Sequence, residues 1–175
     1  MTDLYIVRHA RAGHADSTAW PNDAERPLTD DGRKRFRDAA EGLRRLVPTV
    51  DAVLSSSFVR AWQTAELLHE VARWPEPTRC EELEVGWTPA EAAAVLADRT
   101  EGSVAVVGHE PHLSQLASLL CTGSEGKLRL ELKKGAVTLL AFDGAVAPGS
   151  GLLRWAVPPK ILSGLRPSPP RPPRA

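Results

Sequence analysis

The pattern of apolar and polar positions alternates along the chain between strand-like runs and helix-like stripes. Three short, mainly apolar runs are typical of buried strands: 4–7, 51–54 and 103–107. Four segments carry apolar residues at helical spacing: 29–47, 58–72, the segment after Thr88 and the segment after Pro111. Strands that alternate with helices predict an α/β fold, here a three-layer αβα sandwich around a mostly parallel sheet.

Two of the predicted helices carry clear boundary signals. Thr29 is a plausible N-cap, and Pro48 ends the segment that it begins. Thr88 and Glu91 have the spacing of a capping box, with Pro89 at the first helical position. These signals place the helix starts more firmly than hydrophobic periodicity alone.

The last part of the chain has a different pattern. Residues 128–132 alternate apolar and charged positions, and glycine-containing segments separate them from apolar runs at 136–142 and 152–157. This pattern predicts an antiparallel strand meander at one edge of the sheet. Residues 167–175 are rich in proline and arginine, so we expect one domain over 1–166 and a disordered or polyproline tail.

Composition narrows the class of protein. Among 175 residues, Lys plus Arg and Asp plus Glu are both 22, so net charge indicates neither a nucleic-acid partner nor a membrane partner. Cys80 and Cys121 lie far apart, which argues against a zinc site or a disulfide framework. We find neither a signal peptide nor an apolar stretch of membrane-spanning length, and we expect a cytoplasmic location.

Polar side chains follow the three predicted strands directly. Arg8 and His9 follow the first strand, residues 55–57 and Arg60 follow the second, and His109 follows the third. In open α/β sheets the ligand binds beyond the carboxyl ends of the strands. We therefore expect two histidines, two arginines and a run of serines to meet at one edge of the sheet.

This set of side chains suits phosphoryl transfer. Guanidinium groups match phosphate oxygens, and a neutral imidazole beside them can act as a nucleophile. The positive charge nearby disfavours the imidazolium form of His9, and His109 can hydrogen-bond the transferring phosphoryl group. No carboxylate cluster indicates a metal site, so we expect neither a metal nor another cofactor.

Four ordered segments resemble the histidine phosphatase superfamily, which includes the phosphoglycerate mutases. They are Leu4 to Ala10, Arg26 to Thr29 with Gly32, Ser55 to Ala65, and Gly108 to Pro111. The short chain and its Arg-Pro-Leu-Thr segment look most like the SixA-type phosphohistidine phosphatase branch. Two positions depart from the pattern: Ala10 stands where many members have glycine, and Ser57 stands where proline is usual.

The resemblance implies a fold, an activity and a site. It implies a phosphatase in which His9 is phosphorylated, Arg8 and Arg60 bind phosphate, and His109 completes the pocket. It also implies that phosphorylated proteins or small phosphorylated molecules are the substrates. Two alternatives stay open: a phosphatase for small phosphomonoesters or nucleotides, and a non-catalytic phosphate-binding module. A partner-binding role for the proline-rich tail is a third.

The proton donor is the least constrained assignment. An alcohol leaving group needs a proton, usually from a carboxylic acid. By its register in the resemblance Glu82 is the first candidate, followed by Glu84 and then Glu110. His14 and His112 could line the pocket, but we expect both on the polar surface.

Overall fold

The computed structural model describes residues 1–166 of the chain, so the predicted tail lies outside the described residues. A six-stranded sheet has the order β3-β2-β4-β1-β5-β6. Four strands run parallel: β1 (Thr2–Arg8), β2 (Ala52–Ser55), β3 (Thr78–Arg79) and β4 (Ser103–Gly108). β5 (Val137–Phe142) pairs antiparallel with β1, and β6 (Leu152–Val157) pairs antiparallel with β5. The prediction of a mostly parallel sheet with an antiparallel edge is confirmed.

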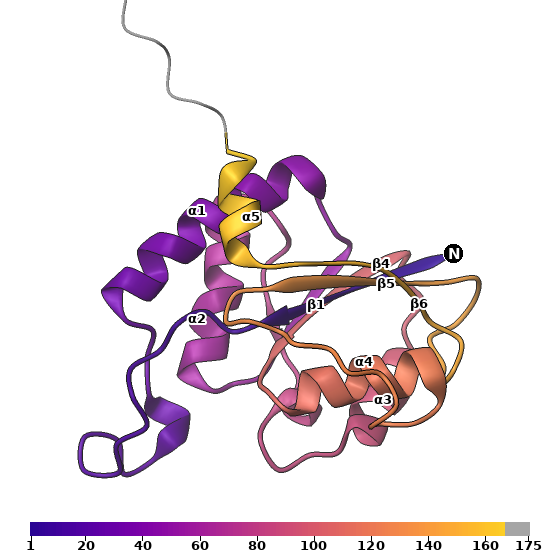
Figure 1. Cartoon of the computed structure of the whole chain (residues 1–175), viewed down its shortest axis with the longest axis horizontal. Helices are drawn as coiled ribbons and strands as arrows, with labels where there is room; N and C mark the ends of the chain where they lie inside the picture. Colours follow the sequence, from indigo (N-terminus) through magenta and orange to yellow (C-terminus); the bar gives the residue numbers. More distant parts are fainter. Residues whose placement is uncertain (167–175) are drawn as a thin grey trace, which may run out of the picture.

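Helices cover both faces of the sheet. One face carries α1 (Asp30–Leu46), α2 (Val59–Leu67) with its π-helical extension Leu68–Ala72, and α5 (Pro159–Gly164). The opposite face carries α3 (Pro89–Ala97) and α4 (His112–Thr122). Figure 1 shows the two groups of helices on opposite sides of the strands. Two single 3₁₀ turns complete the structure, Asp23–Glu25 and Glu81–Leu83.

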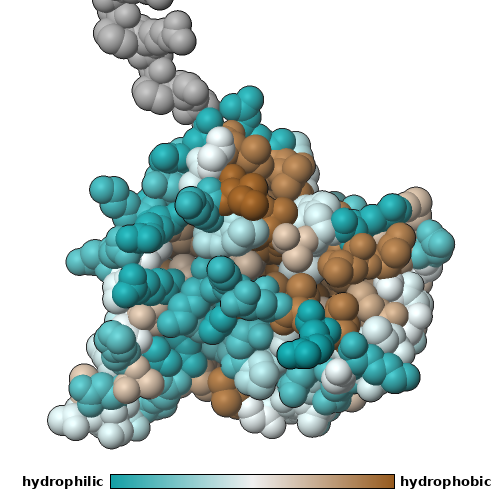
Figure 2. Space-filling model, viewed as in Figure 1, coloured by the Kyte–Doolittle hydropathy of each residue, from teal (hydrophilic) through white to brown (hydrophobic). Residues whose placement is uncertain are grey.

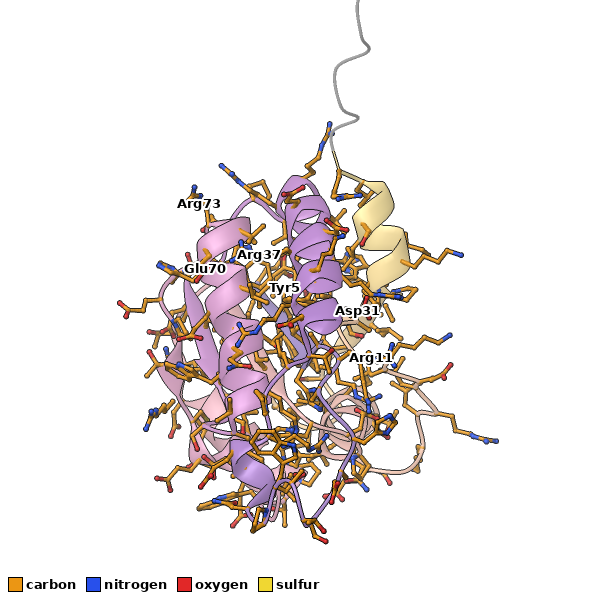
Figure 3. All side chains as sticks on the ribbon, turned by 90° about the vertical axis from the view of Figure 1, so that its left-hand side faces the viewer. Tyr5, Arg11, Asp31, Arg37, Glu70 and Arg73 are labelled. Carbon is orange, nitrogen blue, oxygen red and sulfur yellow. The ribbon has the colours of Figure 1, made fainter. Side chains whose placement is uncertain are left out.

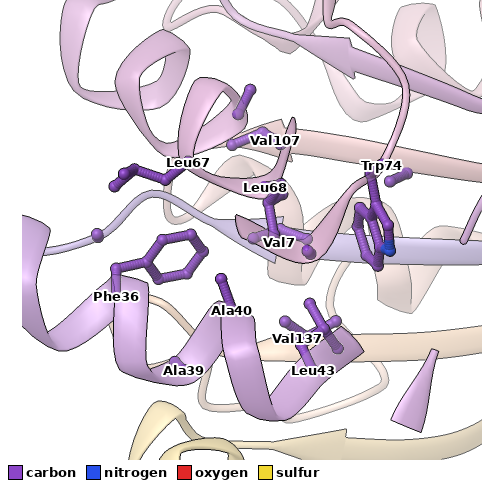
Figure 4. Close-up of a cluster of buried hydrophobic side chains, with 14 of the residues drawn as sticks. Val7, Phe36, Ala39, Ala40, Leu43, Leu67, Leu68, Trp74, Val107 and Val137 are labelled. Carbon is purple, nitrogen blue, oxygen red and sulfur yellow. The ribbon is translucent and has the colours of Figure 1, made fainter. Parts of the chain in front are cut away.

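Strand β1 shows how the sequence produces three layers. Successive side chains of a strand point to opposite faces of its sheet. Tyr5 and Val7 therefore pack with α1 and α2, whereas Leu4 and Ile6 pack with α3 and α4. Figure 4 shows the first of these cores, in which Val7 lies among side chains of α1 and α2. A continuously apolar run is the pattern expected of a strand that is buried on both faces.

The predicted helix starts are confirmed. The Thr29 hydroxyl accepts a hydrogen bond from the Gly32 N–H at 3.0 Å, as an N-cap does. At α3, Thr88 and Glu91 form the reciprocal bonds of a capping box, with Pro89 in the first turn. These caps place the amino ends of both helices with local interactions alone.

Three features of the fold differ from the sequence prediction. Residues 128–132 are not a strand: Leu132 is buried and Leu130 packs against the same core, so the segment adds to the core without pairing in the sheet. The strand β3 and the helix α5 were not predicted, and both are short. Such short elements form because neighbours hold them: β3 pairs with β2, and α5 packs against α1.

The surface of the described residues is mainly hydrophilic on the face shown in Figure 2. Apolar surface gathers there around α5 and along β6, where Leu152 and Ile161 are exposed. No helix within residues 1–166 is both long enough and apolar enough to cross a membrane.

Candidate active site

Two histidines meet because their strands are neighbours. β1 and β4 pair in parallel, and the register places Arg8 beside Gly108. The next residue of each strand is a histidine, so His9 and His109 leave the sheet side by side, with ring centroids 5.2 Å apart. The backbone N–H of His9 donates to the Gly108 carbonyl at 3.0 Å, which continues the pairing by one residue.

The surroundings of His9 hold its ring in one neutral tautomer. Nδ1 lies 2.7 Å from the Ala10 carbonyl oxygen, which can only accept, so Nδ1 carries the proton and Nε2 keeps a lone pair. The side chain is only 6% exposed. Burial lowers the pKa of His9 to about 3, and the Arg60 and Arg8 guanidiniums act in the same direction. His9 is therefore a neutral imidazole at neutral pH, with a hydrogen on Nδ1 and none on Nε2.

His109 is oriented by the strand on its other side. β2 pairs with β4, so Ser56 follows β2 beside His109, and its Oγ lies 2.8 Å from His109 Nε2. Ser56 Oγ also accepts the Phe58 N–H, at 3.2 Å. The Ser56 hydroxyl can then donate its hydrogen bond to His109 Nε2. In this arrangement Nε2 is the acceptor, and the ring hydrogen of His109 is on Nδ1. Burial, together with His9 and Arg60, lowers the pKa of His109 to about 2.

Two guanidinium groups are anchored beside the histidines. Arg8 Nη1 donates to the Leu132 carbonyl at 2.6 Å, from the segment that the sequence predicted as a strand. Arg60, which is 4% exposed, donates from Nη1 to the Asp23 carbonyl at 2.7 Å. Its Nη2 pairs with the Asp23 carboxylate at 2.9 Å. Each arginine is thus held from outside the pocket.

Several buried nitrogen atoms at this place have no hydrogen-bond partner within the described residues. They are Arg8 Nε, Arg60 Nε and His109 Nδ1. Buried polar groups in proteins are nearly always hydrogen-bonded, so a cluster of unpartnered donors points to a ligand. These three nitrogen atoms belong to residues that line one pocket, and guanidinium and imidazole groups of this kind suit an anion with several oxygen atoms.

The four predicted residues Arg8, His9, Arg60 and His109 line one pocket of about 590 Å³. Other charged side chains complete its wall: the cations Arg11, Arg26 and Lys134, and the carboxylates Asp31 and Glu110. Figure 3 shows Arg11 and Asp31 side by side near the amino end of α1, where their charged groups lie 3.6 Å apart. Five cations against two carboxylates make the pocket electropositive, although the whole chain is neutral.

The structure does not bring Glu82 to this pocket. The 3₁₀ turn Glu81–Leu83 buries Leu83 in the core, and this turns Glu82 toward Cys80, whose Sγ donates to its carboxylate at 3.3 Å. Glu84 accepts hydrogen bonds from the N–H and the hydroxyl of Ser57 and does not line the pocket either.

Glu110 is the one of the three candidate acids that lines the pocket. Its Oε1 accepts the Ser114 N–H at 3.0 Å, and its second oxygen has no bond within residues 1–166. Among the three candidate acids, Glu110, which directly follows His109, therefore replaces Glu82 as the carboxylate that shares a pocket with the two histidines.

The two other histidines that the sequence analysis considered for the pocket, His14 and His112, differ from each other. His14 is exposed, as predicted, but it also lines the pocket. His112 is only 7% exposed, so its prediction as polar surface is wrong. It lies in the first turn of α4, and its pKa is lowered by burial although Glu125, Glu110 and Glu91 oppose the shift. No group of three or more potential metal ligands occurs within residues 1–166.

Sequence reasoning missed three cations of the pocket wall. Arg26 lies in one of the segments that carry the family resemblance, which was a usable signal. The sequence held no such signal for Arg11, which lies in a polar loop, or for Lys134, which lies in a region predicted as a strand meander.

Comparison with known proteins agrees with this site. Residues 4–87 match the histidine phosphatase superfamily (branch 1). An uncharacterised protein of Picosynechococcus sp. is 31% identical over 151 residues, which are 82% of this chain and 87% of that protein. The phosphohistidine phosphatase SixA of Escherichia coli is 29% identical over 163 residues, covering 89% of this chain and 93% of SixA.

Solved structures extend the comparison to the fold. The protein histidine phosphatase SixA complexed with tungstate has a TM-score of 0.78 and 26% identity, covering 92% of this chain and 99% of that chain. This chain therefore belongs to the histidine phosphatase superfamily and is a phosphatase. Its similarity to SixA in both sequence and structure supports the SixA-type branch.

Proposed function

We propose that this phosphatase removes the phosphoryl group from phosphohistidine in proteins, without a metal ion and through a phosphohistidine intermediate on His9. The observation that carries the proposal is the neutral His9 imidazole, whose Nε2 keeps its lone pair, in a pocket that two anchored guanidinium groups also line. A buried imidazole with a lowered pKa needs no base to activate it as a nucleophile.

The first step transfers the phosphoryl group to the enzyme. Arg8 and Arg60 bind the phosphoryl oxygens, and His9 Nε2 attacks phosphorus in line with the substrate P–N bond. That bond breaks as the new N–P bond forms, and the substrate histidine leaves as an imidazole. His109 donates its Nδ1–H to a phosphoryl oxygen and offsets the developing charge.

The second step restores the enzyme. Water attacks the phosphoryl group on His9, the N–P bond breaks, and inorganic phosphate leaves while His9 returns to its neutral form. The two guanidiniums supply the positive charge that a metal ion supplies in other phosphatases. SixA is described in complex with tungstate, a tetrahedral oxyanion, which supports an oxyanion pocket of this kind here.

The leaving group decides whether an acid is needed. An imidazole departs readily once protonated by solvent, whereas an alkoxide needs general acid help worth about a hundred- to ten-thousand-fold. Glu110 lines the pocket and Glu82 does not, so Glu110 is the better placed donor for an alcohol. Glu110→Gln should slow an alkyl phosphate strongly and a phosphohistidine peptide little, and Glu82→Gln is its matched control.

The experiment that tests the proposal compares substrates and variants. The wild-type protein, in excess chelator, is assayed on a phosphohistidine peptide and on a panel of phosphorylated metabolites. We expect turnover of the peptide, its loss in His9→Ala, and its retention in His69→Ala, which replaces an exposed histidine. A phosphoryl label on the wild-type protein should be acid-labile and stable to base, as a phosphohistidine is.

Other outcomes have definite meanings. Full activity of His9→Ala would refute the nucleophile, and activity only with added metal would refute metal independence. Turnover of a small phosphomonoester alone would move the substrate to that class.

Both thiols within residues 1–166 are free, which supports the cytoplasmic location that we also propose.

A further inference from the structure

Lys134 is a cation of the pocket wall that makes no ion pair within residues 1–166. It lines the pocket together with the two histidines. The neighbouring wall cations are occupied: Arg11 pairs with Asp31, and Arg26 pairs with Asp23 at 2.8 Å. Arg8 also makes no ion pair there, but it is assigned to the phosphoryl group, so Lys134 is the remaining wall cation that is available to a second anion.

A tight turn holds the backbone of Lys134 at the end of β1. The Ala136 N–H donates to the Lys133 carbonyl at 2.8 Å, which places Lys134 and Gly135 at the two central positions. Gly135 has a φ of 81°, the value that the second central position of a type II turn requires. Its N–H donates to the Arg8 and His9 carbonyls, both at 3.1 Å. The turn therefore ties Lys134 directly to the candidate nucleophile.

The electrostatic surroundings of Lys134 are unfavourable for a cation. Burial lowers the pKa of Lys134, and the four arginines of the pocket lower it further. Two of these arginines, Arg8 and Arg60, are assigned to the transferring phosphoryl group. Two carboxylates nearby pair with other cations, Asp23 with Arg26 and Arg60 and Asp31 with Arg11, so an anionic ligand would stabilise the positive charge of Lys134. One phosphoryl group binds both Arg8 and Arg60, so the positive charge of Lys134 in the same pocket is not neutralised by it.

We infer that Lys134 forms a second anion subsite, which selects phosphohistidine peptides that carry an aspartate or glutamate beside the phosphohistidine. This inference rests on the proposed function, because it takes the protein substrate from it. Lys134 is exposed and lines the same pocket as Arg8 and Arg60, so an anionic group next to the phosphoryl group is within the same pocket as its ammonium group. A flexible ammonium group suits a single carboxylate in this position.

The test uses matched peptides and matched variants. Two phosphohistidine peptides differ only at the residues flanking the phosphohistidine, which are glutamate in one and glutamine in the other. The wild-type protein should favour the glutamate peptide in kcat/KM by about fivefold, the upper range for one exposed ion pair. The preference should shrink as ionic strength rises.

Lys134→Met should remove the preference, and Lys133→Met should retain it. Lys133 is exposed and lies outside the pocket, so it controls for loss of one positive charge from the same turn. Equal rates of the wild-type protein on both peptides would overturn the inference. A preference that survives in Lys134→Met would overturn it as well.

A binding experiment separates this inference from the proposed function. Methylphosphonate carries one anionic group, and phosphonoacetate adds a carboxylate next to it. Calorimetric titration of the wild-type protein should show tighter binding of phosphonoacetate, with the difference lost in Lys134→Met and kept in Lys133→Met. This result would uphold the subsite even if no phosphohistidine peptide were hydrolysed. Equal affinity of the wild-type protein for both compounds would refute the subsite independently of catalysis.

Discussion

The two buried histidines should make the free energy of unfolding depend steeply on pH. The pKa of His9 is lowered to about 3 and that of His109 to about 2, in both cases chiefly by burial, from an ordinary value of 6.5. Above pH 6.5 both rings are neutral in the folded and the unfolded chain. As the pH falls below 6.5, the unfolded chain binds protons that the folded chain does not bind, so the protein loses stability.

The size of the effect follows from linkage. Each histidine contributes about 1.4 kcal/mol per pH unit once the unfolded chain is mostly protonated. Between pH 7 and pH 5 this amounts to about 2 kcal/mol for each ring, or about 4 kcal/mol for the pair. His112, whose pKa is also lowered by burial, acts in the same direction. A loss of about 4 kcal/mol is a large part of the stability of an ordinary domain.

Urea unfolding at pH 7, 6 and 5 measures this loss. The buffers contain no phosphate, because an anion that binds the folded state would stabilise it. Asparagine keeps a hydrogen-bonding amide without titrating, so His9→Asn and His109→Asn should each remove about half of the pair's contribution to the pH dependence. His14→Asn, which replaces an exposed histidine, should leave it unchanged. If the double variant loses as much stability as the wild-type protein, the neutral buried pair is refuted.

Two further substitutions test the packing and the site. A Cβ at Gly42 would overlap the Leu162 carbonyl oxygen between α1 and α5, so Gly42→Ala should lower the free energy of unfolding in urea by about 1–3 kcal/mol. Gly126 has open space around it, so the control Gly126→Ala should lower it far less. Ser56→Ala removes the hydrogen bond that orients His109 and should lower kcat about tenfold with KM nearly unchanged. It should also cost about 1–3 kcal/mol of stability, because it leaves buried His109 Nε2 and the Phe58 N–H without their partner. A loss confined to KM would show instead that Ser56 acts in substrate binding.

Much of the site was predictable because it uses local patterns and one general rule. Apolar runs bounded by Arg8-His9 and Gly108-His109 identify buried strands, and parallel strands end at one edge of a sheet. That rule brought together two histidines that lie 100 positions apart, and the family resemblance selected the same residues. The helix caps at Thr29 and Thr88 were equally predictable, since every group in them lies within four residues.

Other features depended on contacts that no local pattern contains. Glu82 and Glu110 look alike in sequence, but burial of Leu83 turns the first away from the pocket, while the second follows His109 into it. Lys134 reaches the site only because the turn at Gly135 packs against the end of β1.

The sequence by itself determined the order of strands and helices, the helix caps and the side chains at the strand ends, because periodicity and short-range hydrogen bonds act over a few residues. Only the tertiary structure decided that residues 128–132 stay outside the sheet, although they alternate like a strand, because Leu130 and Leu132 pack into the core and the Leu132 carbonyl accepts a hydrogen bond from Arg8. The order of the strands within the sheet, as distinct from their order along the chain, and the direction of each exposed side chain result from competition for edges and core volume across the whole domain.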